Sequence, residues 1–272
     1  MGVTLAVVRR EFQVQCRYPL SMVNLVLLTP LYELALPALL LGSAFLVNGS
    51  AVGLARLVGT TDLAAWLGVG VFVASLLVGA VMSVAGTVRS DRVTGVLEHS
   101  WATPASREAF VLGAVLTGTL FTVASSGLLI AVAVVFLGAS YSPPGLVLSI
   151  PVCGVMLLGN CGLGYLAAAA GLRLRRPEAV LDPVMALAAT FSGVAFPLTV
   201  LPEALRVLTY PLPATWCLDL LRHLTVGTAP LAPPLVELAA ATATSLAFFF
   251  GGRWVFLRTE RQVMAAGTLT QF

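Results

Sequence analysis

The sequence predicts an all-α integral membrane protein, and three observations support this fold class. The 272 residues are 58% hydrophobic and only 10% charged, whereas soluble domains are about 45–50% apolar and about 25% charged. Apolar runs long enough to cross a hydrocarbon core of about 30 Å as helices recur along the whole chain. These runs lack the polar–apolar alternation of barrel strands, and lipid otherwise accepts only helices as spanning structures.

We expect a single domain over residues 1–272 that begins with a helix lying in the membrane surface, residues 1–20. Apolar side chains share one face of that helix: Leu5, Val8, Phe12 and Cys16. Arg9, Arg10 and Arg17 occupy another arc, a pattern typical of interfacial helices. Two interpretations remain open for this face, a positive anchor beside the first span or a surface that also touches a cytoplasmic partner. No cleavable signal peptide is expected.

Six spans are expected, at about 21–47, 63–88, 110–137, 146–172, 183–201 and 235–257. Glu33 lies in the first span, where a carboxylate either touches substrate or an ion, or is hydrogen-bonded between helices. Asp182 and Pro183 resemble a helix cap and first residue, and so predict the start of the fifth span. Residues 202–234 are too polar and proline-rich for a span, which predicts short re-entrant or amphipathic helices between spans five and six.

The arginines predict the orientation, because cytoplasmic loops of membrane proteins carry an excess of positive residues. With six spans, both termini lie on one side together with the loops at 89–108 and 173–176. That side holds twelve of the fifteen arginines. The other side holds Arg56, Arg206 and Arg222. We therefore expect both termini and the 89–108 loop in the cytoplasm.

Composition excludes several functions for this chain. It contains no lysine, so it has no P-loop, whose lysine contacts phosphate. The four cysteines show no metal-ligand spacing, and His99 and His223 fall on opposite sides of the expected membrane. No catalytic or metal site is therefore expected, and no ATP-binding site in this chain. The net charge of +3 is too small to indicate a nucleic-acid partner.

The segment Arg89–Glu108 is the main charged island between apolar runs, with three arginines, three carboxylates and a histidine. Residues 94–101 are expected to form a short helix with Gly95 near its start. Thr103 and Pro104 are expected to cap and begin the third span. Composition alone leaves two interpretations, a solvated loop that fixes topology or a rigid element that transmits a push from a soluble partner to two spans.

Two blocks of residues resemble a known family. Residues 89–98 and 102–107 are similar to the "E-R-x-x-G-T-L-E … T-P-x-S-R" signature of ABC type-2 exporter permeases. Residues 191–197, 201–202 and 212–222 are similar to that family's "SG-x-x-F-P … LP … LP-x-T-x-x-x-D-x-x-R" region. The resemblance covers essentially the whole chain. Asp91 stands where the family often has Glu, and Val96 where it usually has Thr.

The resemblance implies a six-span permease subunit without cofactor of its own, which pairs with a second permease copy or a related chain. Two ABC ATPase subunits would dock on it and carry ATP and Mg. The residues implied in coupling to the ATPase are Arg92, Gly95, Leu97, Glu98, Thr103, Pro104 and Arg107, with Arg9 and Arg10. Those implied in an external gate are Pro197, Pro202, Pro213, Asp219 and Arg222. The expected substrate path holds Thr29, Glu33, Ser75, Met82, Phe191 and Phe196.

Aliphatic and small residues in the spans favour a hydrophobic or amphipathic cargo, such as a drug, antibiotic or lipid, exported by a multidrug-type efflux system. Polysaccharide export is the alternative within the family, although aromatic residues for stacking make up only 8% of the chain. Ion export would rest on Glu33 alone. From another class, an integral membrane enzyme or scaffold stays open. The arginine-rich, lysine-free composition favours a prokaryotic plasma membrane.

Overall fold

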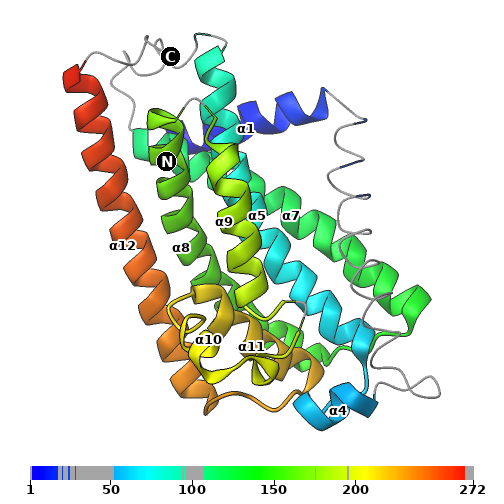
Figure 1. The fold of residues 1–272 in the computed structure, drawn as a ribbon. Coiled ribbons are helices and arrows are strands. Elements are labelled where there is room, and N and C mark those ends of the chain that lie inside the picture. The colour runs from blue at the N-terminus through cyan, green and yellow to red at the C-terminus, as the bar shows by residue number, and fades with distance from the viewer. Residues whose placement is uncertain are drawn as a thin grey trace.

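The computed structural model of this protein describes residues 2–17, 52–93, 107–174, 176–194 and 196–266, together with residues 20, 24, 28 and 95. Within these ranges every regular element is a helix. Figure 1 shows the helices as one bundle, in which the longest run side by side. The all-helical prediction is thus confirmed for the described part of the chain.

Four described helices are long and apolar enough to cross a membrane. They are α5 (Leu63–Val93), α7 (Arg107–Leu137), α8 (Pro143–Arg173) and α12 (Pro234–Ala266). With 31 to 33 residues each, they reach about 46–50 Å at 1.5 Å per residue, more than the roughly 30 Å of a hydrocarbon core. They coincide with the expected second, third, fourth and sixth spans. The prediction of a membrane protein is confirmed at this level.

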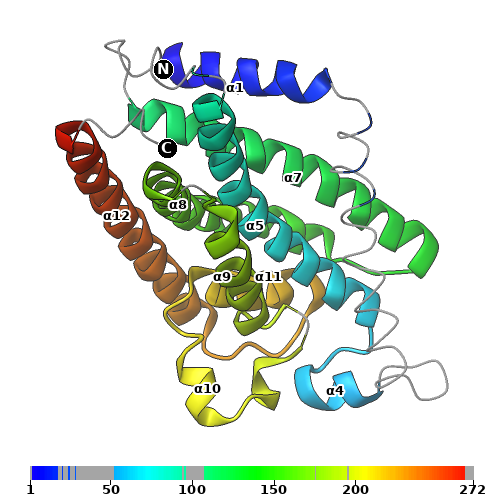
Figure 2. The ribbon, with the colours of Figure 1, turned by 45° about the horizontal axis from the view of Figure 1, so that its top comes forward.

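The shorter helices lie at the two ends of the bundle. Figure 2 shows α1 (Gly2–Cys16) lying across one end, where α5 and α12 finish and α7 begins. At the opposite end lie α4 (Val52–Val58), α10 (Glu203–Val207) and α11 (Pro213–Val226). A single 3₁₀ turn, η2 (Leu198–Val200), precedes α10. Short helices between the fifth and sixth expected spans are therefore present.

The core forms around α5, which packs against α7, α8 and α11, while α8 also packs extensively against α12. Small residues allow these close approaches. A Cβ on Gly162 of α8 would lie 2.3 Å from the backbone of Phe248. A Cβ on Gly118 of α7 would lie 2.7 Å from the side chain of Ser83. These small residues of α7 and α8 therefore allow close packing between helices.

The expected fifth span was wrong at both ends. The helix there, α9 (Glu178–Phe191), starts after Pro177, so Asp182 and Pro183 lie inside it instead of capping it. It stops because Gly193 adopts a φ of +81°, a left-handed conformation that ends helices. At 14 residues, α9 reaches about 21 Å, too short to cross a bilayer by itself.

Most of the remaining expected elements lie outside the residues that the structure describes. Apart from Asn24 and Leu28, the expected first span at about 21–47 lies outside the described residues, and with it Thr29 and Glu33. The same holds for the short helix expected at 94–101, of which only Gly95 is described. Four of the six expected spans thus correspond to long apolar helices, and the fifth corresponds to a shorter helix. Nearly all of the first lies outside the described residues.

Candidate functional site

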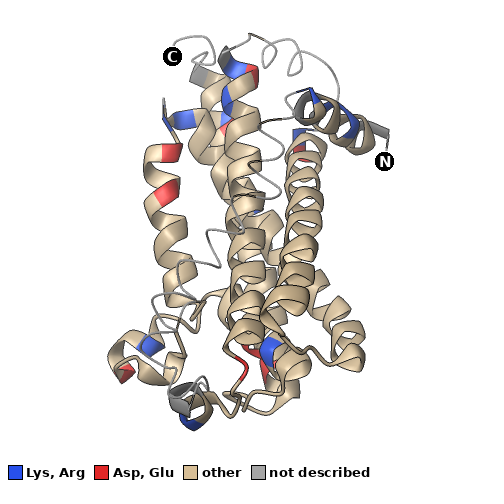
Figure 3. Ribbon diagram, turned by 90° about the vertical axis from the view of Figure 1, so that its right-hand side faces the viewer, with Lys and Arg blue, Asp and Glu red and all other residues tan. Residues whose placement is uncertain are grey.

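Among the described residues, most charged side chains lie toward the two ends of the bundle, as Figure 3 shows. One end carries α1, the last turns of α5, the first turns of α7, the start of α9 and the second half of α12. We call this the charged end. Arg9 and Arg10 of α1, Arg92 in the last turn of α5 and Arg107 at the start of α7, all expected in coupling, lie at this end.

Asp91 joins α5 to α1. Arg10 Nη2 donates to both carboxylate oxygens of Asp91 at 3.1 Å. The Asp91 side chain is only 7% exposed, and a buried carboxylate needs such a partner because losing its hydration is costly. The guanidinium of Arg10 also lies 5.9 Å from the ring centre of Phe110 on α7. Arg10 therefore orients α1 against the bundle, a role that its position in an amphipathic helix did not reveal.

Arg92 joins α5 to the end of α8. Its Nη2 donates to the carbonyl of Leu172 at 2.9 Å and its Nη1 to the carbonyl of Leu174 at 3.1 Å. The last carbonyls of a helix have no intrahelical partner and carry partial negative charge. A guanidinium is well suited to that position. The α5 helix itself ends at Val93, and Gly95, two residues further on, has a left-handed φ of +71°.

The start of α7 is joined to α12 by two ion pairs. Arg107 pairs with Glu260, whose side chain is 7% exposed. Next to it, Arg253 donates to both carboxylate oxygens of Glu108, from Nη2 at 2.8 Å and Nε at 3.2 Å. Such two-point contacts fix geometry as well as attraction. Sequence reasoning identified Arg107, but Glu108, Arg253 and Glu260 were missed as a group.

The segment 89–108 is therefore held at both ends by different helices. Its α5 end is tied to α1 through Asp91, to α8 through Arg92, and to α9 through an exposed pair of Arg89 with Glu178 at 3.1 Å. Its α7 end is tied to α12 through Arg107 and Glu108. Four residues expected in coupling lie outside the described residues: Leu97, Glu98, Thr103 and Pro104.

At the opposite end, Arg222 of α11 organises a second cluster. Its Nη1 donates to the carbonyl of Gly193 at 2.8 Å and its Nη2 to that of Val194 at 2.7 Å. Its Nε donates to the carbonyl of Trp66 at 3.3 Å, and the guanidinium lies 3.5 Å from the centre of the Trp66 ring. We call Arg222, Trp66, Gly193 and Val194 the Arg222 cluster. It ties the turn after α9 to the start of α5.

Burial determines the electrostatics of this cluster. Arg222 is 5% exposed, and burial lowers its pKa to about 9, while neighbouring Asp219 opposes the shift. The guanidinium therefore remains charged at neutral pH. Gly70 of α5 makes the approach possible, because a Cβ there would lie 2.5 Å from the Val194 carbonyl and 2.7 Å from Arg222 Nη2.

Two carboxylates of the same end hold the turn before α12. Asp219 accepts from the amide of Leu231 at 2.8 Å, and fully buried Glu237 accepts from the amide of Ala232 at 2.8 Å. Asp219 and Arg222 line a small pocket of about 130 Å³ together with Pro197. Of the other expected gate residues, Pro202 precedes α10 and Pro213 begins α11.

The expected substrate path is only partly visible. Ser75 and Met82 are seven residues apart and share one face of α5, where both are partly buried. Phe191 and Phe196, also partly buried, flank the turn that Arg222 holds. Among the described residues, no three His, Cys, Asp or Glu side chains gather as a metal site would require.

Comparison with known proteins gives one family. The model of the family described as ABC-2 type transporter matches residues 3–226, most of the chain. No curated protein matches the sequence.

Proposed function

Because the chain belongs to the ABC-2 type transporter family, in which it is a permease component, we propose that it forms the membrane path of an ATP-driven exporter. Its cargo in this proposal is a hydrophobic or amphipathic compound, taken from the cytoplasm or inner leaflet. Separate ATPase subunits supply the energy. The observation that carries the proposal is the anchoring of segment 89–108 at both ends.

Coupling requires that motion of a docked subunit reaches the spans instead of being absorbed by a flexible loop. The ion pairs and carbonyl contacts of the charged end provide such a connection. A displacement of segment 89–108 pulls on α5 and α7 directly. Through Asp91, Arg92 and Arg107 it also pulls on α1, α8 and α12. In this proposal the charged ends of the two permeases face the cytoplasm, and each receives one ATPase subunit.

The Arg222 cluster supports a gate at the other end. It joins α11, the turn after α9 and the first turn of α5 through three carbonyls. Because these contacts are charge-assisted and buried, the three elements move together or the contacts break. We propose that this end closes the path outward, and that a tilt of α5 is transmitted here to α9.

Pairing with a second permease is proposed along α9. This helix packs mainly against α5, and leaves an exposed apolar stripe of Val180, Val184 and Leu187. The spacing of these residues places them on one side of the helix. A second copy or a related permease facing this stripe would place Phe191 and Phe196 beside the path.

Reconstitution of the tagged chain with its ATPase tests this proposal. The complex is purified from its host membrane, placed in vesicles and supplied with ATP and Mg on the side of the charged end. We expect ATP-dependent uptake of an amphipathic fluorescent dye, and ATP hydrolysis that the dye stimulates. The proposal fails if the chain purifies without a P-loop protein and the vesicles show no ATP-dependent uptake.

Two variants address the coupling element within that assay. Glu98→Ala and Arg107→Ala are expected to lower dye-stimulated hydrolysis and transport together, while the amount of permease in the vesicles is unchanged. Arg176→Ala is a suitable control, because this exposed arginine lies between α8 and α9 and outside the segment. Unchanged transport in both test variants would contradict the coupling assignment.

A further inference from the structure

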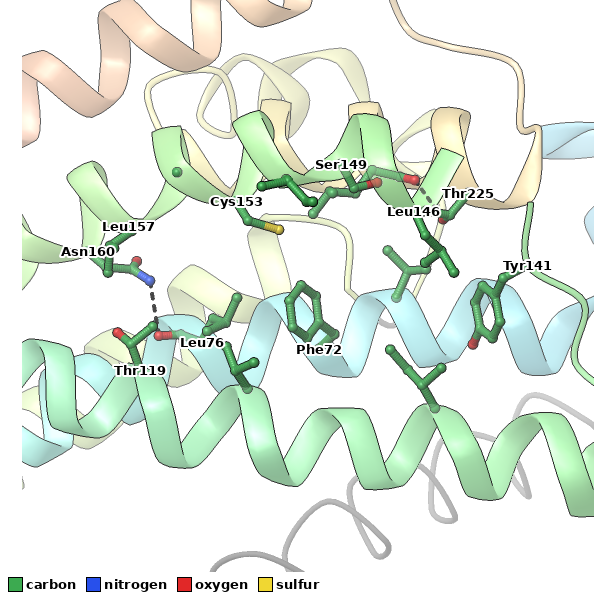
Figure 4. A pocket seen from close by; sticks show the side chains of 16 residues that line it. Phe72, Leu76, Thr119, Tyr141, Leu146, Ser149, Cys153, Leu157, Asn160 and Thr225 are labelled. Atoms are coloured by element: carbon green, nitrogen blue, oxygen red, sulfur yellow. Dashed lines mark hydrogen bonds between the residues drawn. The ribbon is translucent and has the colours of Figure 1, made fainter. Parts of the chain in front are cut away.

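A cavity of about 380 Å³ lies between α5, α7, α8 and α11, far from the charged end (Figure 4). Its size falls within the range of sites that hold drug-sized ligands, about 300–1,000 Å³. Phe72 and Leu76 of α5 form its floor, and α7 and α8 form its walls. Both wall helices pack more closely against α5 than against each other, and the cavity lies where they separate.

A glycine keeps the cavity open. Gly154 of α8 lines it, and a Cβ at this position would meet no atom within 4 Å. Cys153 and Ser149, the other small residues on the same wall, leave further room. The space therefore results from the choice of small residues on one face of α8.

The cavity offers almost nothing to a polar ligand. Its four smaller polar side chains already donate to carbonyls of the chain at 2.7–3.1 Å: Thr119 to Val115, Ser149 to Gly145, Thr225 to Leu221 and Asn160 to Leu76. Tyr141 donates to Ala65 at 3.4 Å. The remaining lining is mostly aliphatic. Such walls select for hydrocarbon, because a polar group placed there would lose its hydration without compensation.

Within the described part of the chain, the cavity is open toward the outside of the bundle. Three lining residues are largely exposed: Val123 at 49%, Leu146 at 44% and Ile150 at 67%. Exposed Val147 and Leu148 continue the apolar surface along α8. In a membrane protein a surface of this kind contacts lipid tails. An empty space of this size beside the tails would forfeit dispersion contacts on all its walls.

We propose that this cavity binds one acyl chain of a membrane lipid, which enters between α7 and α8. The lining of α8 extends from Leu146 to Asn160, about 21 Å at 1.5 Å per residue, whereas one leaflet contributes about half of a 30 Å core. Because the lined stretch is longer than one leaflet, the chain lies along α8, starts in the leaflet opposite to the charged end and extends past the bilayer midplane. Of the expected cargo-path residues that the structure describes, namely Ser75, Met82, Phe191 and Phe196, none lines the cavity.

Photolabelling tests the site. The protein is reconstituted in vesicles of phosphatidylethanolamine and phosphatidylglycerol with a trace of phosphatidylcholine that carries a diazirine at the end of one acyl chain. After illumination, we expect labelled peptides from α7 and α8 around Thr119 and Asn160, at the deep end of the cavity. Gly154→Leu fills the cavity and is expected to lower this labelling about tenfold, the change that about 1.4 kcal/mol produces.

Two controls make the result specific. Gly251→Leu is the same substitution in α12, also at a position where a Cβ meets no atom within 4 Å, and is expected to leave the labelling unchanged. Val123→Trp fills the same cavity from α7, so it replaces Gly154→Leu if that variant does not accumulate. Equal labelling in the wild type and the filled variants would overturn the proposal.

Other occupants give different outcomes. If a second copy of the chain covers the cavity, the wild type shows no label on either helix, and the proposal fails. If the cavity belongs to the cargo path, the label on α7 and α8 decreases when the complex with its ATPase turns over ATP, and a resident lipid is again ruled out. We expect equal labelling with ATP and with ADP.

Discussion

Replacing Gly70 with alanine tests the Arg222 cluster without removing any of its polar groups. The new methyl would lie 2.5 Å from the Val194 carbonyl and 2.7 Å from Arg222 Nη2. Backbone at that distance has to move, so the 2.7 Å bond between Arg222 and Val194 is lost or lengthened. A hydrogen bond to a charged group contributes about 1.5–3 kcal/mol, and overpacking costs about 1–3 kcal/mol more.

Alanine also gains about 1 kcal/mol over glycine inside a helix, which offsets part of that loss. We therefore expect Gly70→Ala to lower the free energy of unfolding by about 2–4 kcal/mol. Gly86→Ala is the matched control in the same helix, because a Cβ at Gly86 meets no atom within 4 Å. That variant is expected to be neutral or more stable than the wild type.

The measurement is equilibrium unfolding in mixed micelles with increasing dodecyl sulfate, followed by circular dichroism. If Gly70→Ala is as stable as Gly86→Ala, the reasoning is refuted, because a methyl group placed against the Arg222 cluster would then cost no more than one placed in open space. If the cluster also acts as a gate, Gly70→Ala additionally alters the leak of dye from vesicles without ATP.

Two further predictions concern the charged end and the turn between α7 and α8. Exchanging the charges of Glu108 and Arg253 restores the pair, so the double variant should be more stable in the same unfolding assay than either single variant, by a small margin because both groups are partly exposed. If all three variants are equally stable, Glu108 and Arg253 do not form a stabilising ion pair. Burial, and secondarily the charge of Asp62, raises the pKa of Tyr141 to about 12. Because the unfolded chain ionises this tyrosine near its ordinary value of about 10, the wild type should lose stability between pH 10 and 11 more steeply than Tyr141→Phe, and parallel curves would contradict this.

The sequence predicted those helices that are indicated by neighbouring residues in the chain. Apolar runs identified α5, α7, α8 and α12, and the proline-rich stretch before α12 indicated short helices. The start of α9 was misplaced because Pro183 resembles a first helical residue, whereas Pro177 lies just before the actual start. Its end was missed because Gly193 was read as part of a motif and not as a helix terminator.

The candidate site was predicted in part for a similar reason. Arg222, Asp219, Arg92 and Arg107 could be singled out, but their partners could not. Arg222 and Arg92 bind backbone carbonyls, which leave no trace in the amino-acid sequence. Arg107 pairs with a residue 153 positions away, and only the register of two packed helices brings the two together.

The pairs at the start of α7 also set an order for biogenesis. Arg107 and Glu108 leave the ribosome long before their partners, because Glu260 and Arg253 follow 153 and 145 positions later. At about 5–20 residues per second, both charges wait roughly 7–30 s for the last helix. During that interval the start of α7 lacks the two ion-pair partners that α12 supplies. The contact between the start of α7 and the last helix is therefore completed only after nearly the whole chain has been synthesised.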